Sequence, residues 1–347
     1  MSIEVELERC KQERKAEVDK YYQTVLLTLG LKDHFDINGK SCHFVSVEPR
    51  FFNIQTSEEV RPDLVLQYDA KHGILCEIKT SLPFSEGYLL SSLKQVEKYS
   101  RDVVGWDTPD RRVNDHDIIL FCHAIDSDRV VGKVQEWLNL SILRVTKKLC
   151  ICEWSMIASP KTGKEVILVR QRFGTTGNDE LNQMLRNNIL IDTETMGIKY
   201  EKCKFTRKEP PVEYLMQELW LNVFPEINVK VEDFETSVDE VLRIAYEYYI
   251  PWSNIEGEYS QIRKRWVKKA LDIFSEIGLA QSVSSNSERF KIFRGKQIQR
   301  DILEYFIEAH CRLFIGRISK KPVLEEEARE QRSLEEFKTG TGDQQTE

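Results

Sequence analysis

The chain has 347 residues, 41% of them hydrophobic, and its 50 basic and 57 acidic residues give a formal net charge of −7 at pH 7. This length accommodates two domains with sizeable cores. The negative balance excludes a general polycation, so a nucleic-acid-binding surface would have to be local. The first residues lack the pattern of a signal peptide and no apolar run reaches transmembrane length, so we expect a cytoplasmic protein without a membrane partner.

Eight cysteines are scattered along the chain, and only Cys150 and Cys152 lie close together in the sequence. Paired CxxC motifs, with or without a histidine pair, are missing from the sequence, which argues against a structural zinc site. We therefore expect most of the cysteines to be reduced and buried as small hydrophobic residues.

Residues 3–29 predict one long helix, because they are charged, helix-favouring and free of proline and glycine. An apolar stripe runs along the second half of this segment, and Gly30 is expected to end the helix. The next residues, up to 60, are mixed in character, with a strand expected at 42–47.

Two apolar runs at 61–66 and 74–79 predict a β-hairpin, because turn-forming residues separate them. If the hairpin pivots on Lys71, Asp63 lies opposite Lys79 and Val65 opposite Glu77. Asp63, Glu77 and Lys79 then share one face, and a slip of one residue would scatter them. The other face is expected to be a core face, made of Leu64, Leu66, Tyr68, Cys76 and Ile78.

Two carboxylates and a lysine on an apolar hairpin are costly to bury unless a ligand neutralises them. A divalent cation does so, and Mg²⁺ prefers hard oxygen ligands while keeping several waters. A neighbouring lysine can orient or deprotonate the attacking water and stabilise developing negative charge. These groups are the ones needed for metal-assisted hydrolysis of a phosphodiester.

The residues after the hairpin alternate between helices and strands, which predicts an α/β domain with a mixed sheet flanked by helices. Gln95 and Tyr99 lie four residues apart, and so on one face of the first of these helices. His116 and His123 flank a strand and are expected to be structural. The expected helices cover 88–100, 128–140 and 178–187, and the expected strands cover 117–124, 149–156 and 166–172.

Pro62-Asp63 followed by Glu77-Ile78-Lys79 resembles the signature of the PD-(D/E)xK nucleases, which have the restriction-endonuclease-like fold. Gln95-Val96-Glu97-Lys98-Tyr99 in the following helix resembles the QxxxY motif of the RecB-like and Holliday-junction-resolvase-like branches. The resemblance covers about the first half of the chain and implies this fold for it.

The resemblance also implies a role for each motif residue. Asp63 and Glu77 would hold Mg²⁺ or Mn²⁺, with the backbone carbonyl of Ile78 as a further ligand. Lys79 would position or activate the water, and the helical glutamine and tyrosine would support the water or a phosphate. The first helix of the family often supplies another acidic ligand about three turns before a glycine. Asp19 fits this offset best and Glu17 next, and the alternative is that both are solvated charges on the helix surface.

The expected organisation is a nuclease-like domain at 1–175, a connector or extension at 176–211, a second domain at 212–318 and an acidic, disordered tail at 319–347. The second domain is expected to be mainly helical. Its segments follow the order of a winged-helix domain: helices at 212–223, 238–249 and 260–277, a small hairpin at 279–293 and a last helix at 297–313.

The region from Pro251 to Arg300 has ten lysines and arginines and five acidic residues, a local charge of +5. A basic helix and wing of this kind can dock in a major groove and on flanking phosphates. The alternative is a winged helix that contacts protein, with the lysines merely solvating it. The expected DNA contacts are Arg263, Lys264, Lys268 and Lys269 on the helix and Arg289, Lys291 and Arg294 on the wing.

The leading functional hypothesis is a Mg²⁺-dependent DNA endonuclease, a hydrolase acting in defence, restriction, repair or recombination. A homodimer would be compatible with cutting two strands, since one site cuts one strand. One alternative is a catalytically inactive module of the nuclease fold that binds DNA or protein. A second alternative is a transcription regulator that acts through the winged helix.

Overall fold

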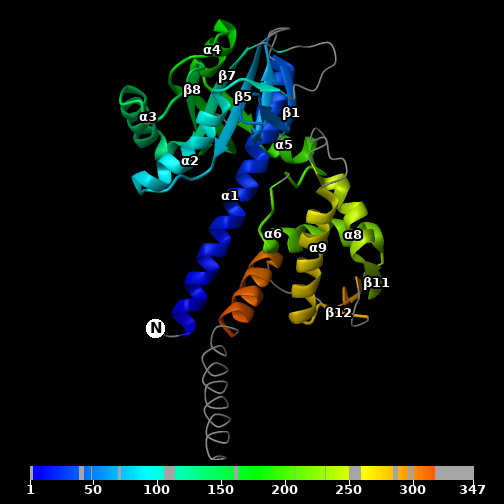
Figure 1. Cartoon of the computed structure of the whole chain (residues 1–347). Coiled ribbons are helices and arrows are strands. Elements are labelled where there is room, and N and C mark those ends of the chain that lie inside the picture. The colour runs from blue at the N-terminus through cyan, green and yellow to red at the C-terminus, as the bar shows by residue number, and fades with distance from the viewer. Residues whose placement is uncertain are drawn as a thin grey trace, which may run out of the picture. The chain divides into compact units, whose positions relative to one another are not determined.

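The computed structural model divides the chain into two compact units (Figure 1). The sheet unit comprises 19–210 and 245–260, and the helical unit comprises 1–18, 211–244 and 261–347. The expected boundary near 211 coincides with a unit boundary, whereas the first 18 residues, expected in the first domain, belong to the helical unit. The structure describes residues 3–38, 43–47, 49–68, 72–104, 113, 115–159, 163–206, 208–230, 232–249, 259–283, 288–295, 298 and 301–316.

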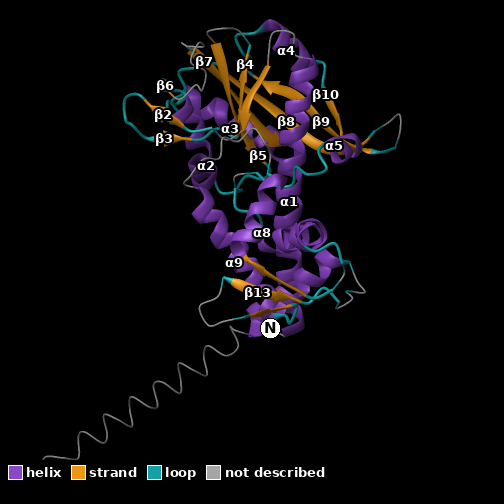
Figure 2. Cartoon of the chain, turned by 90° about the vertical axis from the view of Figure 1, so that its right-hand side faces the viewer, coloured by secondary structure: helices purple, strands orange, loops and turns teal. Residues whose placement is uncertain are grey.

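The sheet unit is built on a mixed sheet of seven strands in the order β1-β4-β5-β7-β8-β9-β10. Figure 2 shows strands of this sheet with helices around them. Strands β5, β7 and β8 are parallel to one another, and the other pairs are antiparallel. This arrangement confirms the predicted α/β class with a mixed sheet flanked by helices. The strands are β1 (His43–Val47), β4 (Leu64–Gln67), β5 (His72–Lys79), β7 (Asp115–His123), β8 (Leu149–Ala158), β9 (Glu165–Phe173) and β10 (Ile189–Asp192).

Helices pack on both faces of this sheet and enclose two hydrophobic cores. One face carries α2 (Glu86–Tyr99) and α3 (Ala124–Asn139). The other face carries the C-terminal half of α1 (Ile3–Asn38), together with α4 (Asp179–Arg186) and α5 (Thr193–Lys199). A small antiparallel sheet, unforeseen in the sequence, has the order β3-β2-β6 and consists of β2 (Phe51–Asn53), β3 (Glu59–Val60) and β6 (Val103–Val104).

The hairpin of β4 and β5 forms with a register two residues away from the expected one. Val65 pairs with Leu75, whereas Glu77 was the expected partner. A shift of two residues preserves the alternation of side chains between the two faces. The five residues of the predicted core face accordingly all lie in one hydrophobic core, while Val65 and Leu75 belong to the core of the opposite face. The expected pivot, Lys71, lies outside the described residues.

Helix α1 runs to Asn38, so the prediction that Gly30 ends it is wrong. The glycine serves a close approach instead, because a side chain at position 30 would collide with Ile191 of β10. A glycine costs a helix about 1 kcal/mol relative to alanine, and here it lets the helix pack directly against the edge strand of the sheet.

The helical unit combines helices with a three-stranded antiparallel sheet of order β11-β13-β12. Its core includes a group of aromatic rings packed around Phe274, whose centroid lies 5.3 Å from that of Phe306 in an edge-to-face arrangement. Strand β11 is absent from the sequence prediction. The elements are α6 (Val212–Glu218), a π-helical turn (Leu219–Val223), α7 (Phe224–Ile227), β11 (Phe234–Ser237), α8 (Val238–Ala245), α9 (Tyr259–Glu276), β12 (Ala280–Ser282), β13 (Arg289–Ile292) and a helix over 302–316.

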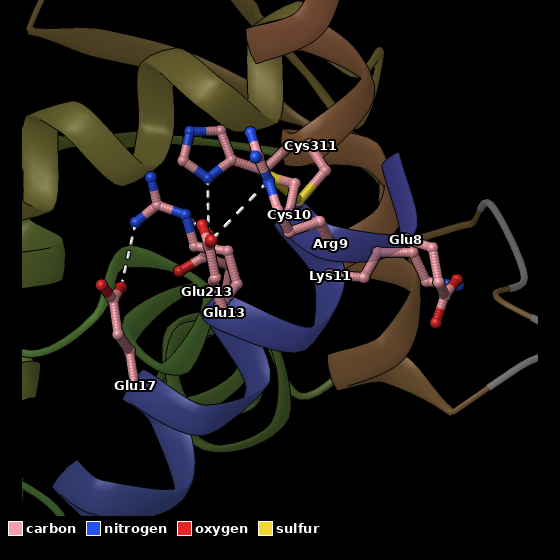
Figure 3. Close-up of a disulfide and its surroundings, with 10 residues drawn as sticks. Glu8, Arg9, Cys10, Lys11, Glu13, Glu17, Glu213 and Cys311 are labelled. Carbon is pink, nitrogen blue, oxygen red and sulfur yellow. Dashed lines mark hydrogen bonds and ion pairs between the residues drawn. A yellow bond between two sulfur atoms is a disulfide. The ribbon is translucent and has the colours of Figure 1, made fainter. Parts of the chain in front are cut away.

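A disulfide joins Cys10 of α1 to Cys311 of the last helix, with their Cα atoms 5.9 Å apart (Figure 3). The expectation of reduced cysteines is therefore wrong at these two positions. It holds for four others, because Cys76, Cys122, Cys150 and Cys152 are buried and do not belong to a disulfide within the described residues. Cys203 is unpaired and half-buried, and Cys42 lies outside the described residues.

The expected tail at 319–347 lies outside the described residues. Among the helices that the structure describes, none is both long and apolar enough to cross a membrane.

Candidate functional site

A cavity of about 550 Å³ opens where the C-terminal end of β5 faces helix α2. It brings together four of the predicted site residues: Asp63, which precedes β4, Glu77 and Lys79 of β5, and Gln95 of α2. Its lining carries more positive than negative side chains. The lining residues are Arg61, Asp63, Glu77, Lys79, Ser91, Ser92, Lys94, Gln95, Lys98 and Lys208.

Asp63 immediately precedes β4, and its backbone extends the hairpin because its N–H donates to the Cys76 carbonyl at 2.9 Å. The residue is 5% exposed. Its Oδ2 accepts a 2.6 Å hydrogen bond from the backbone N–H of Ile78, and its Oδ1 lies 2.6 Å from the ammonium of Lys208. The hairpin therefore fixes one oxygen of this carboxylate, and the other oxygen meets a cation.

Glu77 is 4% exposed and has a partner at each oxygen. Its Oε1 accepts a hydrogen bond from Lys79 at 2.6 Å, and its Oε2 lies 2.6 Å from the hydroxyl of Tyr99. The same hydroxyl lies 2.8 Å from the Arg61 carbonyl and accepts a 3.0 Å hydrogen bond from Gln95 Nε2. Tyr99 is fully buried, so it orients Glu77 from behind and does not itself line the cavity.

Burial and the nearby charge of Asp63 raise the pKa of Glu77, while the lysines at positions 79 and 208 oppose the rise. Burial and the charge of Glu77 raise the pKa of Tyr99 well above its ordinary value, so the phenol remains a hydrogen-bond donor. Two carboxylates held close together in a poorly hydrated place favour a bound cation, because each destabilises the charge of the other.

The donor atoms of this site fit a hard divalent cation. Asp63 and Glu77 offer carboxylate oxygens beside a cavity that has room for water, which matches the preference of Mg²⁺ for a few carboxylates and several waters. Across the described ranges, three or more His, Cys, Asp or Glu side chains do not gather as a metal-binding group. A metal ion here would accordingly be held by two carboxylates with backbone and water oxygens.

The structure does not bring the expected first-helix acid to this site. Asp19 and Glu17 are both exposed on α1, and neither lines the cavity. Conversely, several lining residues were missed in the sequence. The sequence could have indicated the lining residues of α2, because residues three and four apart share a helix face. These residues are Ser91, Ser92, Gln95 and Lys98. Lys208, 145 residues after Asp63, has no such local signal.

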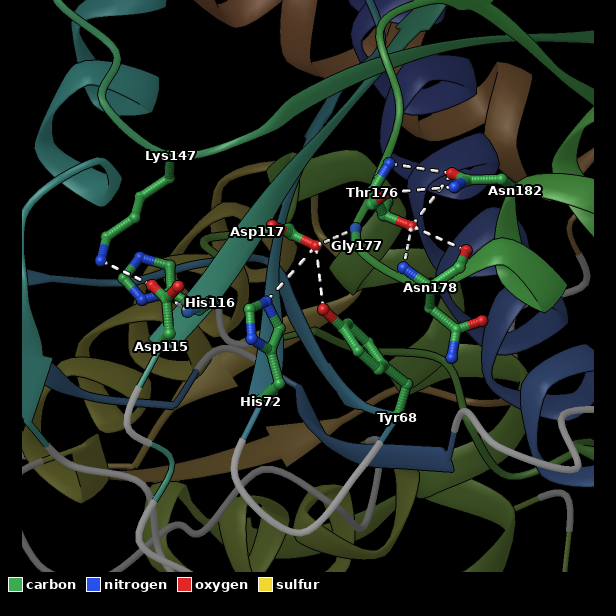
Figure 4. A network of polar contacts seen from close by, with 10 residues as sticks. All are labelled: Tyr68, His72, Asp115, His116, Asp117, Lys147, Thr176, Gly177, Asn178 and Asn182. Atoms are coloured by element: carbon green, nitrogen blue, oxygen red, sulfur yellow. Dashed lines mark hydrogen bonds and ion pairs between the residues drawn. The ribbon is translucent and has the colours of Figure 1, made fainter.

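A second polar network lies around Asp117, at the N-terminal end of the parallel strands (Figure 4). The Asp117 Oδ2 atom accepts hydrogen bonds from the Gly177 N–H at 2.5 Å and from the Tyr68 hydroxyl at 3.1 Å, and it lies 3.4 Å from His72 Nε2. A Cβ at position 177 would lie 2.7 Å from the Tyr68 oxygen, so a larger residue there would displace this hydroxyl. This network ties the segment after β9 to the sheet.

The two histidines that were expected to be structural have structural partners. The His116 ring is buried and its Nε2 lies 2.5 Å from the Tyr99 carbonyl oxygen. His123 caps the N-terminus of α3, because its Nδ1 accepts a hydrogen bond from the Ile125 N–H at 3.3 Å.

The expected DNA-binding residues of the helical unit are less uniform than their charges suggest. Arg263 is fully buried, so the prediction that it contacts DNA is wrong. Lys264 forms ion pairs with Asp239 at 2.9 Å and Glu288 at 2.7 Å. Lys268 pairs with an acid one turn later on α9, at 3.3 Å. The remaining four comprise Lys269, Arg289 and Lys291, which are exposed, and Arg294, which is half-buried.

Comparison with known proteins does not supply a relative. Family models, curated proteins and solved structures all fail to match the chain. Function is therefore inferred from the geometry and chemistry of the chain itself.

Proposed function

We propose that this chain is a metal-dependent nuclease that hydrolyses phosphodiester bonds in DNA. The observation that carries the proposal is the convergence of Asp63, Glu77 and Lys79 on one cation-lined cavity, with both carboxylates buried. Burying two carboxylates destabilises a fold unless their charges are neutralised. A metal ion held by both carboxylates would neutralise them.

The residues divide the chemistry as the PD-(D/E)xK resemblance implies. Asp63 and Glu77 would hold Mg²⁺ or Mn²⁺, with the Ile78 carbonyl as a further ligand. A bound divalent cation supplies Lewis acidity and lowers the pKa of water. Lys79 lies 2.6 Å from Glu77 Oε1, where its ammonium can hold a water molecule and stabilise negative charge. Tyr99 keeps Glu77 in place from the buried side.

Two features of the fold support this proposal. The sheet has helices on both faces, and it carries Glu77 near the C-terminal end of β5 and Asp63 immediately before the antiparallel neighbour β4. Both features are what the restriction-endonuclease-like fold would provide. The helical unit has the element order helix, strand, helix, helix, strand, strand, and a sheet of order β11-β13-β12. This order supports a winged-helix domain, for which Lys269, Arg289 and Lys291 are the exposed candidates to contact DNA phosphates.

A cleavage assay tests the proposal. Duplex, single-stranded, branched and modified DNA are incubated with the protein and Mg²⁺ or Mn²⁺. Glu77→Gln and Lys79→Ala should abolish cleavage that depends on the metal. Glu153→Gln and Lys147→Ala are matched controls, because these side chains are buried to a similar degree in the sheet unit and lie outside the cavity. Undiminished cleavage by both site variants, in clean preparations, would overturn the assignment.

A second candidate is a nuclease-fold module that binds DNA or protein without cutting. The ion pair between Lys208 and Asp63 favours it, because this carboxylate already has a cation in the absence of metal. The intact set of Asp63, Glu77 and Lys79 favours the enzyme, since a binding module has no need of all three. Nucleic-acid binding without metal-dependent cleavage would select the second candidate.

A further inference from the structure

Lys208 reaches the candidate site from a segment that lies far from it in the sequence. The backbone of this segment is anchored, because Phe205 is fully buried and the Thr206 N–H donates to the Tyr21 hydroxyl at 3.1 Å. The Lys208 side chain is 51% exposed, whereas that of its partner Asp63 is 7% exposed. A long, half-exposed side chain on a fixed backbone is a tethered cation that can move over several ångströms.

The position of the Lys208 ammonium matters because it occupies the carboxylate oxygen of Asp63 that could otherwise bind a metal ion. Its Oδ2 is taken by the Ile78 N–H, and its Oδ1 faces Lys208 at 2.6 Å. On the other carboxylate, Oε1 of Glu77 pairs with Lys79 at the same distance. Each carboxylate thus forms an ion pair with one lysine. Lys79 belongs to a strand of the sheet, whereas Lys208 belongs to irregular backbone and is the easier one to displace.

We propose that Lys208 has two successive partners: Asp63 while the site is free of metal, and a phosphate oxygen of the nucleic acid once a divalent cation occupies Asp63. This inference rests on the proposed function, since it assigns a further residue to the same site. A compact ammonium is a suitable point charge for phosphate. The surrounding side chains of Arg61, Lys94 and Lys98 line the same cavity and favour an anion there.

The proposal predicts that removing this cation has opposite effects on the two ligands. Metal binding should tighten, because the cation no longer competes with a tethered ammonium. Nucleic-acid binding should weaken, because a phosphate contact is lost. A purely structural role for Lys208 would not move the two affinities in opposite directions.

Metal affinity is measured by calorimetry with Mn²⁺ and no nucleic acid. Lys208→Met is expected to bind Mn²⁺ about two- to fivefold more tightly than the wild type, the range expected for a partly exposed ion pair. Lys202→Met is the matched control, because Lys202 lies in the same segment, is 56% exposed and pairs with Glu247 away from the cavity. It should leave the affinity unchanged. Asp63→Asn should remove most of the binding.

Nucleic-acid affinity is measured by fluorescence anisotropy of a labelled oligonucleotide duplex and a single strand with Mn²⁺ present. Every protein in this experiment carries Lys79→Ala, which prevents cleavage during the titration. Adding Lys208→Met is expected to weaken binding about three- to tenfold and to reduce the slope of log K against log salt by about one. Adding Lys202→Met should change neither quantity.

An unchanged Mn²⁺ affinity in Lys208→Met, or an unchanged nucleic-acid affinity, overturns the inference, provided that thermal melting shows a folded variant. Failure of the proposed function looks different. If the wild-type protein binds Mn²⁺ through Asp63 but does not cleave DNA, the proposed nuclease function is wrong. The two affinity measurements then still decide whether Lys208 has two successive partners. The absence of Mn²⁺ binding in both the wild type and Lys208→Met would remove both proposals.

Discussion

The two ends of strand β5 present two ways of burying a carboxylate in one sheet. At the N-terminal end, Asp117 receives its partners from the Gly177 backbone, a buried tyrosine and a histidine. At the C-terminal end, Asp63 and Glu77 lie beside a cavity, and lysine ammoniums cover the side that faces it. The partners of Asp117 are held in place by the fold, whereas Asp63 is paired with Lys208, a side chain that can be displaced.

This difference separates a structural carboxylate from one that is available to a ligand. Burial alone does not distinguish them, since Asp117 is 2% exposed and Asp63 is 5% exposed. What distinguishes them is the mobility of the partners and the empty volume next to them. Stability and ligand binding should therefore respond in opposite ways to the same substitution at the two ends.

The largest effect is expected on catalysis. Asp63→Asn should reduce metal-dependent cleavage by about a thousandfold or more, because it removes a charged metal ligand and the electrostatic stabilisation that depends on it. Asp117→Asn should leave the initial rate within about threefold at a temperature where both proteins are folded. Initial rates on one DNA substrate measure this, and an inactive but fully folded Asp117→Asn would break the comparison.

Stability should show the reverse order. Asp117→Asn is expected to lower the free energy of unfolding by about 2 kcal/mol, because one oxygen accepts from several buried groups and an amide cannot replace it fully. Asp63→Asn should cost less than about 0.5 kcal/mol or stabilise the fold, since it keeps an acceptor for Ile78 and removes repulsion from Glu77. Urea denaturation measures the free energy of unfolding of both variants. Equal decreases in this free energy would argue against the distinction between a structural carboxylate and one available to a ligand.

The tyrosines at the two ends provide a matched pair with a smaller expected effect. Tyr99→Phe should lower cleavage about tenfold, because Glu77 loses the hydroxyl that orients it, and should cost about 1 kcal/mol of stability. Tyr68→Phe removes the corresponding hydroxyl from Asp117 and should cost about the same stability with cleavage unchanged. Rates and melting temperatures are compared for both, and equal rates would show that Tyr99 has only a structural role.

The smallest expected effect concerns a third buried carboxylate, Glu213 of the helical unit, whose Oε1 lies 2.6 Å from His310 Nδ1. Burial, the largest single influence, opposes its ionisation, but the hydrogen bond from His310, a backbone hydrogen bond and the charges of His310 and Arg14 together lower the pKa of Glu213. A lowered folded-state pKa contributes stability above the unfolded value of about 4.3, and this is lost as the pH falls through the folded value.

Glu213→Gln should therefore be less stable than the wild type by about 1 kcal/mol at pH 7. The gap should close as the pH falls from the unfolded value through the lowered pKa of Glu213, where the wild-type carboxylate becomes protonated. Melting temperatures from pH 3 to pH 7 measure this difference. A gap that stays constant with pH would mean that the charge of Glu213 is unimportant.

The sequence allowed the local features of the site to be predicted, because they repeat with the period of a strand or a helix. The alternation in β4 and β5 gave the correct core face even though the register was wrong by two residues, since the turn that sets the register has no decisive residue pattern. The spacing of Gln95 and Tyr99 likewise placed both side chains on one helix face, where Gln95 donates to the Tyr99 hydroxyl and this hydroxyl contacts Glu77.

Features that depend on distant segments escaped prediction. Lys208 meets Asp63 only after the whole sheet has formed, and the Cys10–Cys311 pair is separated by 301 residues. Gly30 was misread because a glycine that permits close packing looks the same in sequence as one that ends a helix. Arg263 was misread because charge alone does not reveal which side of α9 faces the core.

The discontinuous make-up of the helical unit has a consequence for the order of events on the ribosome. Residues 1–18 are synthesised well before the other parts of their unit, which begin at residue 211 and extend past Cys311. Most of the sheet unit, from residue 19 to 210, is complete long before that point. The nascent chain can therefore fold its sheet before the rest of the helical unit is made, and a chain that ends before the last helix would lack Cys311, the disulfide partner of Cys10.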